Sequence, residues 1–180
     1  ENRRLRAALF EAASAAPRVD VRMKTRAVAV DRGEHGVTVT LDSGAVITAP
    51  LLIAAEGRNS PTREAAGLRV ARWTYDNAAI VTSLHHEHPH ENIAFEIFYP
   101  DGPFAILPLN DDEQGHRSCI VWSVTRDQAP GMMKLSDRGW LAEADKRIGG
   151  FLGALGPLGK RMSYPLGFHH AAKIVSNRLA

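Results

Sequence analysis

Four short apolar runs follow one another between residues 78 and 124, and they constrain the fold more than any other feature of the sequence. The runs are AAIVTSL, IAFEIFY, PFAILPL and SCIVWSV. They are rich in β-branched and aromatic residues and are bounded by Gly, Pro, Asp and His clusters, which is typical of β-strands. Asp101-Gly102-Pro103 and the polar segment 110–115 are the expected hairpin turns. This region therefore predicts an antiparallel sheet.

The N-terminal part adds a helix and a smaller group of strands. Leu5, Leu9 and Ala13 recur at helical spacing until Pro17 interrupts the pattern. The runs VRMKTRAVAV, VTVTL and AVITA alternate apolar and polar residues and are separated by Gly-containing turns, so they predict a β-meander. The more continuously apolar run at residues 51–55 is typical of a strand covered on both faces.

Towards the C-terminus, Ser136 is a candidate cap for a helix from about Asp137 to Leu152, and MSYPLGF at residues 162–168 predicts another strand. The fold class is therefore α+β, with a mostly antiparallel or mixed sheet of about five or six strands backed by helices. The expected helix and meander precede this sheet. After Gly67 the sequence changes to successive strand-like apolar runs, which predicts a boundary between a segment 1–68 and a sheet domain 69–180.

Composition excludes several classes of function. The 22 basic and 20 acidic residues give a formal charge of +2, which is too balanced for a broad nucleic-acid-binding surface. No apolar run approaches the roughly 20 residues that a membrane-spanning helix needs, and no secretory signal is present. The single cysteine, Cys119, excludes an internal disulfide and fits a reducing compartment. Its apolar neighbours indicate a core residue rather than a nucleophile.

The segment LLIAAEGRNSPTR at residues 51–63 is the strongest candidate for a binding site. Ser60-Pro61 is a helix-start signal, and a helix start presents free backbone N–H groups that suit phosphate or another anion. Gly57 permits a positive φ angle or the close approach of a ligand. Glu56 offers a carboxylate beyond the end of a strand, where acids commonly bind ribose hydroxyls. The local pattern is equally consistent with a connection that binds nothing.

Histidines cluster at residues 85–90 and again at 169–170. His86-Glu87-x-x-His90 matches the zinc-protease pattern in its letters, but that chemistry needs both histidines on one helical face. Pro89 disfavours a helix there, so we expect a loop of solvated histidines and no metal site. The sequence also contains no Gly-x-Ser-x-Gly elbow and no P-loop, so no motif supports a hydrolase or kinase function.

Glu56-Gly57-Arg58-Asn59-Ser60-Pro61-Thr62-Arg63 resembles the Asp-Gly motif, Asp-Gly-x-x-Ser-x-x-Arg, of FAD-dependent aromatic hydroxylases with the p-hydroxybenzoate hydroxylase fold. The segments ENRRLRAAL, WTYDNAAIVTSLHHEHPH, GPFAILPL, VWSV and YPLGF are similar, in the same order, to the ubiquinone-biosynthesis hydroxylases of the 2-octaprenyl-6-methoxyphenol hydroxylase type. The resemblance covers nearly the whole chain. It implies that the helix and meander belong to an FAD-binding domain. The cofactor-binding residues that it implies are Glu56, Gly57, Arg58, Ser60 and Arg63.

The sequence departs from this family in two ways. Ala54 and Glu56 stand where the family usually has Gly and Asp, and the longer Glu side chain brings its carboxylate nearer to any ligand. The Gly-x-Gly-x-x-Gly fingerprint and the downstream Gly-Asp segment of the family are missing from these 180 residues. We therefore expect a central fragment that retains little or no FAD by itself.

The resemblance implies that the full-length enzyme hydroxylates a phenol carrying a polyprenyl tail, with FAD, NAD(P)H and O2. No catalytic side chain is assigned, because the flavin supplies the chemistry while the protein supplies orientation and a dry pocket. The candidate substrate-binding residues lie on the predicted sheet strands: Phe95, Ile97, Phe104, Ile106, Pro108, Arg117, Tyr164 and Pro165. Core packing is the alternative for the apolar ones, and exposure to solvent is the alternative for Arg117.

The same resemblance implies a cytoplasmic bacterial enzyme with at most peripheral membrane association. Its partners would be the polyprenyl phenol and a ubiquinone-synthesis enzyme assembly, with no nucleic acid. A non-catalytic binding or interaction module with a related sheet remains the alternative function.

Overall fold

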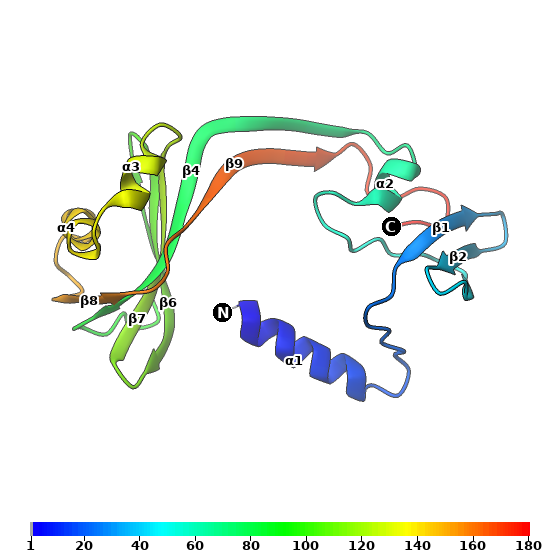
Figure 1. Ribbon diagram of the computed structural model, residues 1–180, viewed down its shortest axis with the longest axis horizontal. Coiled ribbons are helices and arrows are strands. Elements are labelled where there is room, and N and C mark those ends of the chain that lie inside the picture. Colours follow the sequence, from blue (N-terminus) through cyan, green and yellow to red (C-terminus); the bar gives the residue numbers. More distant parts are fainter. Residues whose placement is uncertain (1) are drawn as a thin grey trace. The chain divides into compact units, whose positions relative to one another are not determined.

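The computed structural model describes residues 2–180, which form two compact units. The first unit contains residues 2–72 and 169–180, and the second contains Trp73–Phe168. Figure 1 shows the elements of both units along the chain. The sequence predicts a domain boundary after residue 68. In the structure the last twelve residues, 169–180, group with the N-terminal unit. No helix among residues 2–180 is long and apolar enough to cross a membrane.

The first unit contains helix α1 (Asn2–Ala15), a three-stranded antiparallel sheet and the short helix α2 (Pro61–Ala65). The sheet has the order β1 (Ala27–Arg32), β2 (Val37–Leu41), β3 (Val46–Ala49), which confirms the predicted meander. Its first strand starts only at Ala27, because the preceding residues 21–26 contain a turn. No residue of α1 is buried, and its large apolar side chains Leu5, Leu9 and Phe10 are exposed.

The second unit is built on the larger sheet, in which the order is β5-β6-β7-β4-β8 and β9 also pairs with β4. Its strands are β4 (Val70–His86), β5 (Phe95–Tyr99), β6 (Gly102–Asp112), β7 (Gly115–Thr125), β8 (Leu155–Leu158) and β9 (Met162–Ala171). The central β4–β7, β5–β6 and β6–β7 pairs are all antiparallel. The predicted α+β class with an antiparallel sheet of this size is confirmed.

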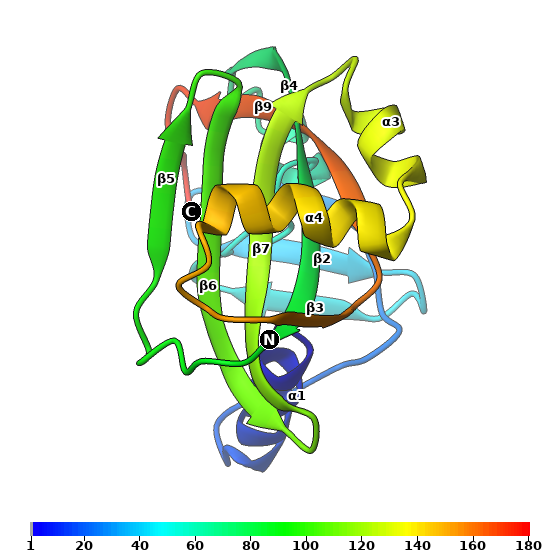
Figure 2. The ribbon, with the colours of Figure 1, turned by 90° about the vertical axis from the view of Figure 1, so that its left-hand side faces the viewer.

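Helix α4 (Asp137–Ile148) covers one face of this sheet, as Figure 2 shows, and α3 (Ala129–Lys134) precedes it. The Ser136 hydroxyl accepts a hydrogen bond from the Gly139 N–H, as expected for an N-cap. Trp140, Ala144 and Ile148 of α4 pack on the sheet, where Trp140 meets Trp122 with ring centroids 5.4 Å apart. The core of the second unit therefore lies between α4 and one side of the sheet.

Three expectations about the secondary structure are wrong in detail. Helix α4 ends at Ile148 rather than Leu152, because Gly149 adopts a left-handed conformation with φ 74° and caps the helix. The glycine-rich segment 153–159, in which we expected no strand, contains strand β8. The run 51–55 is not a strand covered on both faces, since Leu51 and Ile53 are 51% and 70% exposed. Its Leu52 instead makes one isolated parallel bridge to Leu179.

Candidate functional site

The motif at residues 56–63 forms a tight turn closed by its own side chains. The Ser60 hydroxyl caps α2 by accepting a hydrogen bond from the Arg63 N–H at 3.1 Å, and it also donates to the Glu56 carboxylate. The same carboxylate oxygen, Oε2, accepts from the Thr62 N–H at 3.1 Å. Ser60 is 3% exposed, so this cap is a buried polar contact. The expected capping role of Ser60 is confirmed.

Glu56 occupies the place that an external anion would take at the start of α2. The hydrogen bond from Ser60 is the main reason that the pKa of the Glu56 carboxyl lies below its usual value of 4.5, and the Thr62 N–H and the charge of Arg63 act in the same direction. The two backbone N–H groups at the helix start are thus bound by Ser60 and Glu56. Helix α2 therefore does not present these groups to a phosphate, contrary to what the sequence alone suggests.

The Arg63 side chain binds the backbone of the loop at residues 57–58 rather than the Glu56 carboxylate. Its guanidinium donates to the carbonyl oxygens of Gly57 at 3.3 Å and Arg58 at 2.6 Å. Gly57 has φ 79°, and a Cβ added there would meet no atom within 4 Å, so the backbone at this point is open to a ligand. The sequence argument for glycine at this position thus agrees with the geometry of the turn.

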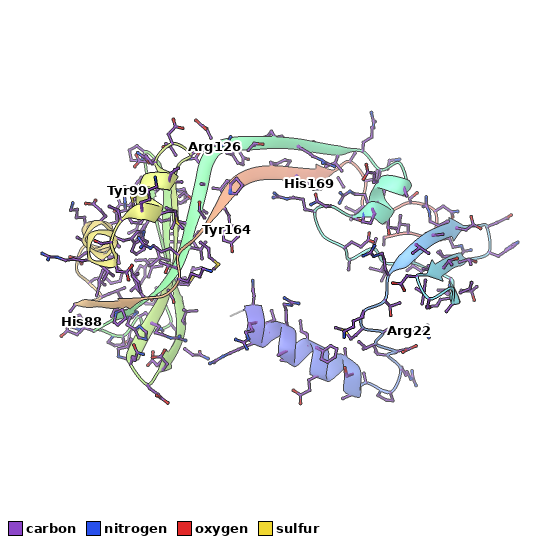
Figure 3. All side chains as sticks on the ribbon, viewed as in Figure 1. Arg22, His88, Tyr99, Arg126, Tyr164 and His169 are labelled. Carbon is purple, nitrogen blue, oxygen red and sulfur yellow. The ribbon has the colours of Figure 1, made fainter. Side chains whose placement is uncertain are left out.

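A cavity of about 220 Å³ opens beside this turn. Its lining includes Gly57, Ser60 and Arg63 from the motif, and Lys173, Ile174 and Ala180 from the end of the chain. His169, labelled in Figure 3, belongs to the same unit. Burial lowers the pKa of its imidazole, and the positive charges of Arg63, Arg72 and Arg58 lower it further. This concentration of cationic side chains suits an anionic ligand.

The larger sheet has two different faces, and the register shows which residues share each of them. The pairs Phe95↔Ile106, Ile97↔Phe104 and Phe104↔Trp122 place these side chains on the face that α4 covers. Phe104 and Ile106 are 0% and 1% exposed and belong to the core. For these two candidate substrate residues the packing alternative holds, because their strand positions face the helix rather than the open side.

The other candidates on this helix-covered face are partly buried. Phe95 packs against Phe151 with ring centroids 4.7 Å apart, and Ile97 is paired with Phe104. Pro108 is paired with the fully buried Ser118. Because paired residues of an antiparallel sheet point to the same side, these three positions belong to the face under α4 as well.

The opposite face of the sheet, here called the open face, carries a compact set of small and apolar side chains. Across β6, β7 and β4 the pairs Ala105↔Val121 and Val121↔Val81 form one row, and Leu107↔Cys119 and Cys119↔Ser83 form the next. These positions alternate with the buried core positions along each strand. Burial raises the pKa of the Cys119 thiol, so this cysteine is a poor nucleophile.

Polar residues close one end of the open face. The Arg117 guanidinium forms an ion pair with Asp112 at 3.1 Å and donates to the Asn110 carbonyl oxygen. His85 Nε2 lies 3.0 Å from the other oxygen of Asp112. The pKa of Asp112 is lowered, first by the Gln114 N–H and then by His85. Arg117 is therefore held at the β6–β7 hairpin rather than free in solvent.

Tyr164 and Pro165 lie on β9, and both are exposed. Figure 3 shows Tyr164 on the side of the sheet away from α4. Its hydroxyl lies 3.3 Å from the sulfur of Met162. Of the predicted substrate residues, Tyr164 is thus on the same side as the open face.

The histidine cluster is a structural feature of the sheet end. His86 ends β4 and is 5% exposed, with Nε2 3.0 Å from the Ser118 hydroxyl and Nδ1 2.7 Å from the His88 carbonyl oxygen. The expectation that this segment is not helical is confirmed, but His86 is packed rather than solvated. Burial is the main cause of the lowered pKa of His86. Among residues 2–180 no group of His, Cys, Asp or Glu is arranged to hold a metal ion.

Comparison with known proteins identifies the family. A family model described as FAD binding domain matches residues 2–149. The chain belongs to the FAD-binding-domain family. Within it, ubiquinone hydroxylase UbiL of Rhodospirillum rubrum is 38% identical over 180 residues, all of this chain and 41% of the relative. The 3-demethoxyubiquinol 3-hydroxylase of Escherichia coli is 32% identical over 180 residues, all of this chain and 45% of the relative.

The chain thus spans less than half the length of these FAD-binding-domain relatives. Solved structures show the same fold at lower identity. PqsL of Pseudomonas aeruginosa has a TM-score of 0.73 and 21% identity, and the match covers 98% of this chain and 49% of PqsL. The p-nitrophenol 4-monooxygenase PnpA of Pseudomonas putida has a TM-score of 0.69 and 18% identity, over 98% of this chain and 45% of PnpA.

Sequence reasoning missed two sets of residues. Val81, Cys119 and Val121 sit on the open face, and the strict alternation along each strand could have separated them from Phe104 and Ile106 once the helix-covered side was known. Lys173 and Ile174 line the cavity near the motif, and nothing in the local pattern connects them with residues 56–63. Their place depends on the return of the chain end to the first unit.

Proposed function

We propose that this chain is the central part of an FAD-dependent monooxygenase that hydroxylates a polyprenylated phenol in ubiquinone biosynthesis, with NAD(P)H and O2 as co-substrates. The observation that carries the proposal is the 38% identity to a ubiquinone hydroxylase along the full 180 residues. Family membership and the flavoprotein fold support the cofactor. We assign residues 1–68 to the FAD-binding domain and residues 69–180 to the substrate domain.

We assign cofactor contacts to the turn at residues 56–63. Gly57 lets the dinucleotide approach the backbone, and Arg58 and Arg63 supply positive charge on the phosphate side. The Ser60 hydroxyl and the Thr62 N–H both donate to Oε2 of Glu56, and we assign the other carboxylate oxygen, Oε1, to a ribose hydroxyl of the dinucleotide. Ser60 acts indirectly by fixing the Glu56 carboxylate. These residues fit an anionic dinucleotide, although we expect this part alone to bind FAD weakly.

Bound FAD, reduced by NAD(P)H, would activate molecular oxygen for transfer to an aromatic ring. The side chains of this chain would bind and orient the ring and keep water away from it. The open face suits this role because Val81, Ala105 and Val121 form an apolar row without a charged group. Arg117 and Tyr164 at its borders are the candidates to meet the phenolic oxygen.

The candidates under α4 support the pocket from behind. Phe104 and Ile106 belong to the core and Phe95 packs against it, while Ile97 and Pro108 are paired with residues of the same face. We therefore assign all five to positioning of the open face rather than to substrate contact. Pro165 lies on the exposed strand β9 beside Tyr164. We keep it as a residue that shapes the border of the pocket.

The proposal includes a cellular setting. A polyprenyl tail partitions into a bilayer, so the enzyme would be cytoplasmic with peripheral access to the membrane surface. A ubiquinone-synthesis assembly is the natural protein partner for such a substrate. No role with nucleic acid is proposed, in line with the balanced charge.

The experiment uses the full-length protein loaded with FAD. A flavin absorption spectrum, together with oxidation of NAD(P)H that a polyprenyl phenol stimulates and that yields a hydroxylated product, is the expected result. Val121→Asp places a carboxylate on the open face and should lower kcat/KM about tenfold or more while the flavin content stays the same. Glu34→Asp, on an exposed turn, is the matched control. Protein that binds no FAD, or a Val121→Asp variant with full activity, contradicts the assignment.

A further inference from the structure

The paired strands β4 and β9 carry an exposed aromatic surface in the N-terminal part of β4, before the residues of β4 that pair with β7. Trp73 and Phe168 stack across the two strands with ring centroids 4.0 Å apart and an angle of 15° between the rings. Tyr75 meets Trp73 edge-to-face at 6.4 Å. Trp73, Tyr75 and Phe168 are 50%, 45% and 37% exposed. Large aromatic side chains gathered on one exposed surface usually mark a binding site for an apolar ligand or partner.

The polarity of this pair of strands differs between its two sides. Side chains alternate along a strand, so Trp73 and Tyr75 share one side of β4 while Arg72 and Asp76 point to the other. On β9, Met162, Tyr164 and Phe168 share a side, and the Trp73–Phe168 stack shows that it is the same side as Trp73. We call the side with Trp73, Tyr75, Met162, Tyr164 and Phe168 the aromatic ribbon. Within residues 73–76 and 162–168 this side carries no ionisable side chain except the two tyrosines, and His170 follows on the same side of β9.

The aromatic ribbon continues into the open face of the sheet. Trp73 and Tyr75 have the same alternation along β4 as Val81 and Ser83, which belong to the open face. An extended strand rises about 3.3 Å per residue, so the path from Trp73 to Val81 is about 26 Å long. Between Tyr75 and Val81 this side carries Asn77, whose amide donates to the Asp101 carbonyl oxygen, and Ala79. The track is longer than a phenol ring requires.

We propose that the aromatic ribbon binds the polyprenyl tail of the substrate whose ring lies on the open face. This inference rests on the proposed function, from which the ring and its tail are taken. The continuity of the two surfaces favours a single long ligand, because one end would lie on the open face and the other on the ribbon. Flat aromatic rings offer an unsaturated hydrocarbon chain a large contact area, and burial of that area supplies affinity in proportion to tail length.

The test compares two substrates of the full-length, FAD-loaded protein: the same phenol with a long polyprenyl tail and with a single isoprene unit. Trp73→Ala and Phe168→Ala should each lower kcat/KM for the long-tailed phenol about tenfold through KM and leave the short-tailed phenol unchanged. Trp73→Phe should recover most of the loss. Ile93→Ala, which removes an exposed apolar side chain of the second unit outside the ribbon, is the control and should change neither value.

Other outcomes overturn the inference in distinguishable ways. Equal losses for both phenols would mean that the ribbon acts on the ring or on the cofactor. No loss for either phenol would mean that the tail lies elsewhere. Dissociation of an oligomer by Trp73→Ala, seen in sedimentation, would identify the ribbon as a contact between copies of the chain. If the unaltered protein hydroxylates neither phenol, the proposed function fails. Calorimetric titration with both phenols then tests the inference separately. If the unaltered protein binds the long-tailed phenol more tightly than the short-tailed one, and Trp73→Ala abolishes this difference, the inference is still supported.

Discussion

At the scale of single residues, the turn at 56–63 shows that side chains of a motif can bind the same backbone N–H groups that the sequence pattern offers to a ligand. Glu56 and Ser60 satisfy the first N–H groups of α2, so the charge that the sequence pattern offers to a ligand is partly used inside the chain. Sequence analysis could identify the cap, since Ser before Pro at a helix start has a direct physical meaning. It could not show that Glu56 folds back on the same helix, because that depends on the path of residues 57–59.

Removal of this cap should be measurable. Ser60→Ala removes the acceptor for the Arg63 N–H and the donor to Glu56, and we expect a loss of about 1 kcal/mol in the free energy of unfolding. The pKa of the Glu56 carboxyl should rise towards its usual value, because Ser60 is the main cause of its lowering. Urea denaturation and carboxyl titration by NMR check the two effects. Ser14→Ala on the exposed side of α1 is the control, and equal stability of both variants would refute the cap.

His86 makes the stability of the sheet depend on pH. Burial lowers the pKa of its imidazole below 6.5 in the folded protein, so the unfolded state takes up the proton first as the pH falls. The stability linked to His86 is complete above pH 6.5 and is lost progressively from there down through the lowered pKa. Urea denaturation between pH 8 and pH 5 should show this loss, and His86→Gln should reduce it. Parallel pH profiles of stability for the two proteins would contradict this role of His86.

At the scale of elements, alternation and turn signals were sufficient to predict most of the strands, both hairpins and helix α4. The strand β8 was not predictable from a β-forming pattern. Gly156 in the strand and Gly159 just after it are explained instead by the close approach of this segment to His85 and Ser83 of β4. Nor could the sequence show which side of each strand faces α4. That choice moved Phe104 and Ile106 from the proposed pocket into the core.

The β5–β6 hairpin should be sensitive to one glycine. Gly102 has φ 130°, and an added Cβ would lie 2.8 Å from Cβ of Ser123 on β7. Gly102→Ala should therefore cost roughly 2–3 kcal/mol in the free energy of unfolding, from backbone strain and overpacking together. Gly115→Ala is a matched control in the β6–β7 hairpin, where φ is 113° but no atom lies within 4 Å of the added Cβ. In thermal denaturation the melting temperature of Gly102→Ala should lie well below that of Gly115→Ala, and the reverse order would exclude a steric cause.

At the scale of the whole molecule, the sequence resemblance identified a family that the comparisons confirm, while the site required the three-dimensional structure. The order of segments along the chain is visible in the sequence. The meeting of residues 169–180 with residues 2–72 is a long-range association that no local pattern encodes. The cofactor and substrate residues therefore stay proposals, and the open face and the aromatic ribbon are the surfaces that they depend on.

Oxygen transfer by the full-length protein tests the central claim most directly. The FAD-loaded enzyme is supplied with NAD(P)H, a polyprenyl phenol and isotopically labelled dioxygen, and the product is analysed by mass spectrometry. We predict a phenol that has gained a single labelled oxygen atom on its ring, with formation strongly reduced in Val121→Asp. A product that carries oxygen from water, or the absence of any ring hydroxylation by flavin-replete protein, would contradict the account.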